Sequence, residues 1–379
     1  MPLYHDDDQT MLAESASQFM SEQGNTQKQL RHWRDRDCKD GFGHELWKQF
    51  AEMGFTGILV DEDHGGLGMG HVEAGIVLEE IGRNLTPSPF LTSSVLAATA
   101  LKHASDDAKG RWLPGMVEGE KIYAVAIDEG AKHRPETIRT RAEKSGNGFR
   151  ISGQKDFVIH GASADMMIVA ARTSGDDSDE DGLTLFAVPK DASGMSHDSV
   201  RLVDSSMATH TKFDGVELDG DAVIGEVDGG PAVLNAMLTA GRIGAAAEGA
   251  GVARGAMDMT IDYLKQRKQF GKLIGEFQAL QHRASHLYSE VEIARAVVIK
   301  AAQMLDGGSE KADLMASVAK AKVAKAAGLA VREGVQMHGG IGMTDEYDIG
   351  LYMKRDRALQ EFLGDQYYHA GRVAEMSGY

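Results

Sequence analysis

The chain has 379 residues, with 57 acidic against 40 basic side chains, a formal net charge of −17, and a single cysteine, Cys38. This length predicts two or three domains with sizeable cores, and one cysteine excludes an intrachain disulfide and a multi-cysteine metal cluster. The acidic balance argues against nucleic acid as the main partner, because phosphate binding depends on clustered Lys and Arg.

The first residues, MPLYHDDDQT, are acidic where a signal peptide is basic and then apolar. No window reaches the roughly 18 uncharged apolar residues that a membrane-spanning helix needs. We therefore expect a cytoplasmic protein without membrane insertion and without a metal site.

Apolar residues recur at helical spacing from the start to about residue 121. The clearest runs are Leu46, Trp47, Phe50 and Met53, and Ala74, Val77, Leu78 and Ile81. Glycines and prolines interrupt the pattern at 65–68 and 87–89. This predicts an N-terminal α-helical domain over residues 1–121.

Between residues 122 and 226 the apolar period changes to two, in short runs separated by Gly and Asp. This predicts a central β domain of short antiparallel strands. The acidic stretch 176–181 lies between two of these runs, and we interpret it as a solvated hairpin loop.

The remainder, 227–379, is Ala-rich and predicts a C-terminal four-helix bundle with helices over 231–268, 276–306, 309–338 and 349–375. The expected fold class is therefore α+β and multidomain.

The most specific motif spans residues 263–282. Gly271 can end a helix in the left-handed conformation, which would place Arg267 and Phe270 on the last helical turn and Gln278 at the start of the next helix. A guanidinium suits a diphosphate, a ring can pack on an adenine or ribose, and an amide can bind polar edges. The same residues also fit a plain helix cap with a surface arginine and a core phenylalanine.

A second motif follows the next Ala-rich helix and contains Gln336, Gly339, Gly340 and Gly342. Paired glycines let another backbone or a diphosphate approach closely. Taken alone, the segment fits a helix stop equally well.

In this order, on an α-β-α chain, the two motifs resemble the acyl-CoA dehydrogenase family over essentially the whole sequence. The resemblance implies that one corner holds the ADP half of an FAD whose flavin ring lies in the neighbouring subunit. The corresponding residues are Arg267, Phe270, Gln278, Gln336, Gly339 and Gly340. Arg242 is similar to the family's arginine near the CoA tail of the acyl-CoA substrate.

The family's chemistry needs a carboxylate that removes the proton α to the thioester, and the β-hydride passes to FAD, which gives a trans-2-enoyl-CoA. Two alignments place Leu363 or Gly364 where that glutamate usually stands, and the alternative base position is Gly241. None of these is an acid. The flavin side also departs, because the segment from Tyr123 to Asp128 corresponds to a threonine-bearing segment of the family but lacks its hydroxyl.

The departures from the family pattern affect the catalytic base and the flavin-side segment, whereas the residues for the ADP half of FAD are kept. In this the chain resembles the smaller subunit of heteromeric acyl-CoA dehydrogenases of the pimeloyl-CoA and steroid side-chain type. The resemblance implies lipid or steroid catabolism by β-oxidation, an α2β2 heterotetramer with a second dehydrogenase subunit, and reoxidation by an electron-transfer flavoprotein. Homo-oligomers remain an alternative.

Three acids could replace the missing base: Asp365, Glu248 and Glu361. An exposed or salt-bridged acid is the alternative reading for each. His160 and His338 fit satisfied polar residues at a subunit contact better than catalytic groups. Two further hypotheses stay open, a self-sufficient dehydrogenase, flavin oxidase or hydroxylase that uses Asp365 or Glu248, and a non-catalytic structural subunit.

Overall fold

The computed structural model describes residues 3–379 and divides into two compact units. One, here called the bundle unit, comprises the chain up to His32 and residues 71–87 and 242–379. The other, called the sheet unit, comprises residues 33–70 and 88–241. The three-domain division expected from the sequence remains a prediction.

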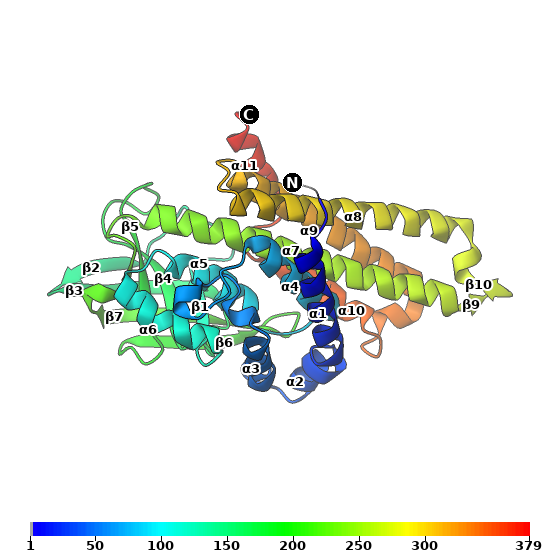
Figure 1. Cartoon of the computed structure of the whole chain (residues 1–379), viewed down its shortest axis with the longest axis horizontal. Helices are drawn as coiled ribbons and strands as arrows, with labels where there is room; N and C mark the ends of the chain where they lie inside the picture. Colours follow the sequence, from blue (N-terminus) through cyan, green and yellow to red (C-terminus); the bar gives the residue numbers. More distant parts are fainter. Residues whose placement is uncertain (1–2) are drawn as a thin grey trace. The chain divides into compact units, whose positions relative to one another are not determined.

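The bundle unit is helical (Figure 1). Its helices are α1 (Asp7–Glu22), α4 (His71–Asn84), the part of α7 (Gly230–Gln266) that follows residue 241, α8 (Gln278–Asp306), α9 (Ala312–His338), α10 (Ile349–Glu361) and α11 (Gln366–Met376). Asp6 caps α1, where its side chain accepts the N–H of Gln9 at 2.9 Å. No helix among residues 3–379 combines the length and the apolar character needed to cross a membrane.

The expected bundle helix over 349–375 is two helices, because the chain turns between α10 and α11. Leu363 and Gly364 both have positive φ angles, 60° and 100°. Only glycine adopts this region at little cost, so a helix cannot continue through the two residues. The turn contains Leu363 and Gly364, the two alternative positions at which the sequence analysis expects the usual base.

The core of the bundle unit lies among α7, α8, α9 and α10. Small side chains of α7 and α9, such as Ala256 and Ala330, pack with larger ones, such as Leu287, Ile349 and Tyr352. Alanine faces let the helix axes come close, which explains why an Ala-rich sequence still builds a continuous core.

Helices α4 and α7 approach each other through glycines. A Cβ atom on Gly82 of α4 would lie 2.0 Å from the carbonyl oxygen of Glu248, and one on Gly251 of α7 would lie 1.9 Å from that of Glu79. Gly255 is equally constrained, since its Cβ would lie 2.5 Å from the carbonyl oxygen of Arg83. Any larger residue at these positions would force the two backbones apart.

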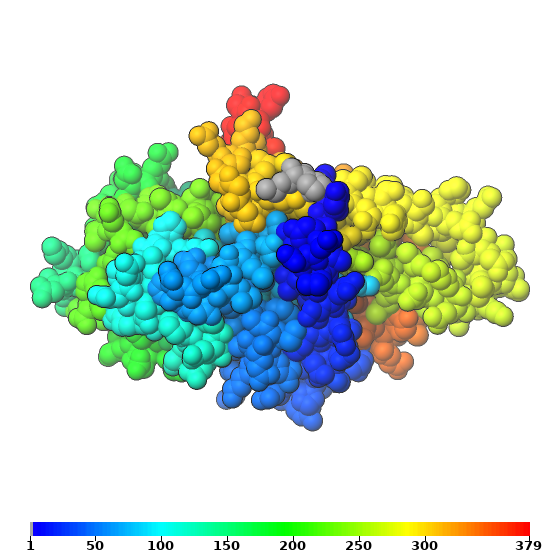
Figure 2. Space-filling model, in the orientation of Figure 1, coloured from blue at the N-terminus to red at the C-terminus, as the bar shows by residue number. Residues whose placement is uncertain are grey.

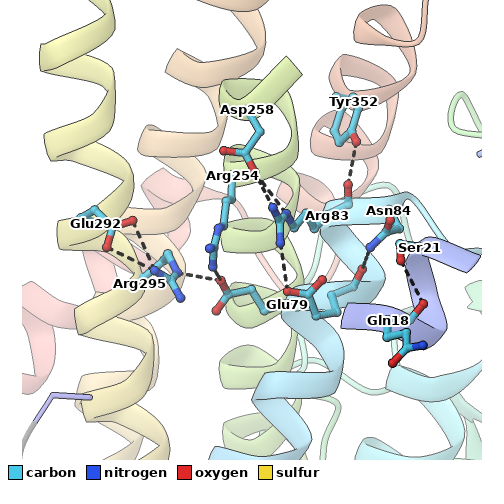
Figure 3. A network of polar contacts seen from close by, with 11 residues as sticks. Gln18, Ser21, Glu79, Arg83, Asn84, Arg254, Asp258, Glu292, Arg295 and Tyr352 are labelled. Atoms are coloured by element: carbon cyan, nitrogen blue, oxygen red, sulfur yellow. Dashed lines mark hydrogen bonds and ion pairs between the residues drawn. The ribbon is translucent and has the colours of Figure 1, made fainter. Parts of the chain in front are cut away.

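Ion pairs flank this helix contact (Figure 3). Glu79 on α4 accepts from Arg254 of α7 at 3.1 Å and from Arg295 of α8 at 2.6 Å. Arg83, one turn further along α4, donates to Asp258 of α7 at 2.8 Å. These contacts tie three helices together around the glycine face.

The sheet unit contains α3 (His44–Glu52), α5 (Ala98–Leu101), α6 (Asp106–Val117) and one eight-stranded sheet. The strands are β1 (Tyr123–Ala126), β2 (Arg141–Ser145), β3 (Gly148–Ile159), β4 (Met166–Arg172), β5 (Leu183–Pro189), β6 (Met195–Arg201), β7 (Met207–Leu218) and β8 (Val223–Ile224). Their order is β6-β7-β3-β2-β4-β5-β8, with β1 paired to β4.

The sheet is mixed, whereas the sequence predicts antiparallel strands only. Most neighbours are antiparallel, but β1 and β2 both pair with β4 in parallel. Every residue of β4 is buried, which matches its uninterrupted apolar run, while β6 lies at an edge and is largely exposed.

The acidic segment 176–181 connects β4 to β5, so the predicted hairpin loop is confirmed. Its backbone carbonyls, at Asp177, Asp179 and Asp181, accept hydrogen bonds from the buried guanidinium of Arg172. The loop therefore closes over a buried charge that the acidic sequence alone did not indicate.

We predict that Gly251→Ala lowers the free energy of unfolding by about 3 kcal/mol or more, since its Cβ would overlap the carbonyl of Glu79. Gly371→Ala on α11 is the matched control, because a Cβ there meets no atom within 4 Å and gains about 0.5–1 kcal/mol of helix propensity. Urea unfolding followed by circular dichroism measures both. An unchanged midpoint in Gly251→Ala would contradict the close approach of α4 and α7.

Candidate functional site

The motif at the end of α7 forms a hairpin. The prediction that Phe270 lies on the last helical turn is wrong, because α7 ends at Gln266. Arg267 directly follows the helix, and its N–H still donates to the carbonyl of Tyr263 at 2.9 Å. Two short strands follow, β9 (Lys268–Gln269) and β10 (Lys272–Leu273), paired antiparallel. Phe270 and Gly271 are the two turn residues, with φ angles of 54° and 80°, the pattern of a type I′ turn.

Phe270 at the tip of this hairpin is 91% exposed. A left-handed backbone costs a residue with a Cβ about 1–2 kcal/mol, and exposure of the ring forfeits most of its burial energy. The phenyl group is therefore poorly used within this chain. Its placement fits a role toward a ligand or a second subunit.

Gln278, the first residue of α8, and Gln336, near the end of α9, are exposed as well. Gly339 and Gly340 follow α9, and a Cβ added to either would meet no atom within 4 Å. Two adjacent glycines in open space let a diphosphate approach the backbone without steric hindrance.

A small apolar cluster holds the hairpin against the end of α9. Leu264, Ile274 and Met337 are buried together, with Tyr263 and Phe277 packed against them. In the space-filling view the hairpin segment, coloured yellow-green to yellow, reaches the surface (Figure 2). The structure thus brings both sequence motifs to one exposed corner of the bundle unit.

His338 is part of the interior below this corner. Its ring centroid lies 4.4 Å from that of Tyr263 and 4.8 Å from that of Tyr347, and Nδ1 donates to the carbonyl of Gly334 at 2.7 Å. Burial lowers the pKa of His338, so the ring is neutral at physiological pH. It fits a packing role better than proton transfer.

The turn that contains the usual base position is firmly held. Leu363 is 3% exposed, and the carbonyl oxygen of Leu363 accepts from Nε2 of His369 at 2.9 Å. The buried ammonium of Lys320 on α9 donates to the carbonyls of Leu359 and Gly364 at 2.7 and 3.1 Å. Lys320 therefore caps the C-terminus of α10 and fixes the turn at once.

Neither aligned position can present an acid in this chain. Leu363 is apolar, and a Cβ at Gly364 would lie 2.4 Å from Cδ1 of Tyr368. The two substitute bases nearest to this turn in the sequence, Asp365 and Glu361, make contacts that stabilise the helices. Asp365 caps α11 by accepting the N–H groups of Tyr367 and Tyr368 at 2.9 and 2.8 Å, and Glu361 pairs with Arg357 at 2.8 Å.

Glu248 lies on the buried face of α7 and is 2% exposed. Nε of Arg355 on α10 donates to its carboxylate at 2.8 Å, and Nη2 of the same arginine at 2.5 Å. To act as a base, Glu248 would have to give up these two charge-assisted bonds to Arg355.

Arg242 is 1% exposed and projects from α7 toward α9. Nη1 donates to Asp313 at 3.0 Å, and Arg372 of α11 donates to the same carboxylate at 2.6 Å. Nε and Nη2 have no hydrogen-bond partner among residues 3–379. Burial lowers the pKa of Arg242, although a guanidinium keeps its proton in proteins.

Lys320 also lines a cavity of about 10 Å³ together with Asp356 and Gln360, which is room for about one water molecule. Burial lowers the pKa of Lys320 to about 8 and raises the pKa of Asp356 to about 6. The sequence analysis missed this pair. A lysine at helical spacing among the buried alanines of α9, such as Ala316 and Ala327, was the available signal.

In the sheet unit, Asp128 follows β1. Its carboxylate bonds to Nδ1 of His133 at 2.9 Å and to the N–H of Arg134 at 3.1 Å. Next to it, Lys155 is completely buried and pairs with Glu129 at 2.7 Å. Tyr123 is held too, since its hydroxyl donates to the carbonyl of Trp112 at 2.6 Å and burial raises its pKa.

Phe157 and His160 at the end of β3 both have left-handed backbones, with φ of 53° and 59°. Phe157 is half exposed, and His160 is buried with its ring against Phe42. The N–H of His160 donates to the carbonyl of Met207. No group of three or more His, Cys, Asp or Glu side chains suited to a metal ion occurs in the part of the chain that the structure describes.

Models of the acyl-CoA dehydrogenase N-terminal, middle and C-terminal domains match residues 6–120, 128–216 and 228–377. This chain belongs to the acyl-CoA dehydrogenase family. The fold predicted from the sequence is thereby confirmed, with its N-terminal helices, central sheet and C-terminal bundle.

Individual relatives agree with this assignment. Acyl-CoA dehydrogenase FadE12 of Mycobacterium tuberculosis is 33% identical over 336 residues, which is 86% of each chain. A solved variant of the Tcur3481-Tcur3483 steroid ACAD has a TM-score of 0.89 at 29% identity and covers 98% of both chains. Butyryl-CoA dehydrogenase from Megasphaera elsdenii has a TM-score of 0.90 at 25% identity and covers both chains fully.

We predict that Phe270→Asn raises the free energy of unfolding of the isolated chain by about 1 kcal/mol, because asparagine tolerates the left-handed backbone and the Asn-Gly pair favours a type I′ turn. Thermal unfolding measures this change. Phe270→Leu, which keeps both the apolar side chain and the strain, should show no gain. Equal stability of the asparagine variant would contradict the strained turn.

We predict that Asp356→Asn changes the pH dependence of stability. The folded pKa of about 6 lies above the ordinary 3.8, so the native state binds more protons between these values and stability falls as pH rises from about 4 to 6. This effect, about 3 kcal/mol at most, is lost in the variant. Urea unfolding of both proteins across that range measures it, and a pH-independent difference would contradict the buried carboxyl.

Proposed function

We propose that this chain is one subunit of a heteromeric FAD-dependent acyl-CoA dehydrogenase, which introduces a trans double bond between the α and β carbons of an acyl-CoA thioester. In this proposal the second dehydrogenase subunit supplies the catalytic base and the flavin-ring pocket. An electron-transfer flavoprotein would reoxidise the cofactor, and the α2β2 assembly would act in the cytoplasm.

The observation that carries the proposal is the contrast between the two ends of the bundle unit. At one end, Leu363 occupies the turn where the base would stand, and Gly364 has no room for a side chain. At the other end, the hairpin with Phe270 is fully built and exposed. A chain that had lost flavin chemistry altogether would have no reason to keep a strained, exposed ring.

The residues of the exposed corner fit the ADP half of FAD. Arg267 would bind the diphosphate, Phe270 would cover the adenine or ribose, and Gln278 and Gln336 would bind polar edges beside the open backbone of Gly339 and Gly340. When bound, FAD supplies the acceptor for the β-hydride.

The Tcur3481-Tcur3483 steroid ACAD, at 29% identity, supports the heteromer because its name pairs two chains, and the substrate class because it is a steroid enzyme. By this likeness the acyl group is bulky, as in steroid side-chain catabolism by β-oxidation. A homo-oligomer is the alternative assembly.

A self-sufficient dehydrogenase or related flavin oxidase or hydroxylase would need Glu248 or Asp365 as its base. Glu248 would first have to leave Arg355, and Asp365 would have to leave the N-terminus of α11. Glu361 would have to leave Arg357. Each of these acids would have to break an existing hydrogen bond or ion pair before acting as a base, so we favour a base supplied by the partner subunit. A purely structural subunit does not explain the exposed hairpin.

The test is to purify the chain alone and together with a candidate dehydrogenase partner, and to record visible absorbance. We expect oxidised flavin only in the complex, with bleaching when acyl-CoA is added. Flavin that is bound by the isolated chain and bleached by substrate would contradict the dependence on a partner.

In that complex, Arg267→Ala should lower FAD occupancy by about tenfold or more while assembly is unchanged, because a charge-assisted bond to the diphosphate is lost. Size-exclusion chromatography and flavin absorbance measure the two quantities. Arg357→Ala, which removes an exposed arginine of α10, is the matched control. Full FAD occupancy in Arg267→Ala would favour a structural subunit instead.

A further inference from the structure

Arg242 lies in the interior of the bundle unit and is 1% exposed. Nη1 donates to Asp313, but Nε and Nη2 have no hydrogen-bond partner among residues 3–379. Buried polar groups are nearly always hydrogen-bonded, and an unpaired charged donor is more costly than an unpaired neutral one. The two donors therefore need an acceptor that is not part of the chain. A ligand can provide it only after Arg242 becomes accessible.

Part of the cover over Arg242 comes from α11. Arg372 of α11 donates to Asp313 at 2.6 Å, and Arg242 donates to the same carboxylate at 3.0 Å. Tyr368, also on α11, and Arg372 both act electrostatically on Arg242. Movement of α11 away from α9 would therefore remove two side chains from the surroundings of Arg242.

α11 has little buried surface of its own. It is 11 residues long, and helices shorter than about 12–15 residues are marginal in water without tertiary packing. Within this helix, all of which the structure describes, His369 is the one buried residue, while Tyr367 and Met376 are 76% and 44% exposed. Figure 1 shows the end of α11 projecting beyond the long helices of the bundle unit. Such a helix can separate from its neighbours at a lower free energy than global unfolding requires.

The turn before α11 carries two costs that opening would relieve. Leu363 has a φ angle of 60°, a region that residues with a Cβ atom adopt only at an energetic cost. Below the turn, Lys320 and Asp356 are buried and line one cavity with room for about one water molecule. Burial lowers the pKa of Lys320 to about 8, although Asp356, Asp365 and Glu361 all act to raise it, and burial raises the pKa of Asp356 to about 6. Each charged form is therefore disfavoured where it lies, and backbone strain of this kind is common in switch regions.

Polar contacts connect the closed segment to α9. Arg372 binds Asp313 and also donates to Ser317 at 3.3 Å. Lys320 donates to the carbonyl of Gly364 at 3.1 Å. Because water replaces polar contacts of this kind when they separate, they oppose opening by much less than their strength in isolation.

We propose that residues 362–376, here called the strap, open away from α9 while the rest of the bundle unit stays folded, and that this movement admits a ligand to Nε and Nη2 of Arg242. Closure over the bound ligand would pair both donors. The opening is a property of this chain alone. The choice of ligand rests on the proposed function, because it takes acyl-CoA to be the molecule that reaches Arg242.

The experiment measures the labelling of individual arginines by phenylglyoxal, followed by peptide mass spectrometry. Arg172 is the internal control, because it is also buried, at 3% exposed, but lies in the sheet unit. We expect Arg242 to be labelled at least about tenfold faster than Arg172 in the folded chain, since local opening needs less free energy than global unfolding.

Arg372→Met removes the ion pair with Asp313 but keeps a long apolar side chain over the same surface. Labelling of Arg242 should then become about tenfold faster, the size of a hydrogen bond between charged groups, while labelling of Arg172 is unchanged. Arg357→Met, which removes an exposed ion pair of α10, is the matched control and should leave both rates unchanged.

Hydrogen exchange of the wild-type chain tests the strap without any substitution. Amides of α11 should be less protected than those of α10 and should share one free energy of opening. If Arg372→Met does not fold, this measurement and the comparison of Arg242 with Arg172 in the wild-type chain still decide the question.

The ligand is tested in the complex with the partner subunit, with coenzyme A as the probe. Coenzyme A should slow the labelling of Arg242. If acyl-CoA bleaches the flavin but coenzyme A leaves the labelling unchanged, the ligand route is wrong while the acyl-CoA function stands. If coenzyme A slows the labelling but acyl-CoA does not bleach the flavin, the proposed function fails while the strap and its ligand stand.

The strap itself is decided by the isolated chain. Equal labelling of Arg242 and Arg172, or amides of α11 that are as protected as those of α10, would overturn it.

Discussion

The close approach of α4 and α7 is the constraint on which the bundle unit depends. Gly82, Gly251 and Gly255 let the two backbones touch, and no side chain fits between them. Because the contact is backbone to backbone, it fixes the rotation of α7 about its axis. That rotation decides which residues of α7 face inward, and among them are Arg242 and Glu248. The ion pairs of Glu79 and Arg83 reinforce the same orientation.

Once α7 is fixed, the charges buried along it have to be neutralised from other helices. Glu248 is neutralised by Arg355 of α10, and Asp313 of α9 lies between Arg242 and Arg372. Lys320 is used differently, since it donates to the carbonyls that surround the turn at Leu363. The interior of the bundle unit is thus a set of paired charges, in which Nε and Nη2 of Arg242 have no partner among residues 3–379.

The helices, the sheet and the family were predictable because they depend on local periodicity and on motifs read along the chain. The spacing of Val77, Leu78 and Ile81 predicted a buried helix face, and all three are buried. The hairpin at Phe270 was not predicted, because a phenylalanine in a left-handed turn runs against local preference. The parallel pairing of β1 with β4 was missed for a different reason, since it joins residues about 40 positions apart.

By itself the sequence determined the family, the architecture and the absence of an acid at Leu363, Gly364 and Gly241, because each is a property of residue order. Only the tertiary structure decided what the substitute acids do. Whether Glu248 is a free carboxylate or half of an ion pair depends on Arg355, 107 positions away. The unpaired donors of Arg242 could not be seen in the sequence either. A donor is recognised as unpaired only when the positions of all the surrounding acceptors are known, and the fold sets those positions.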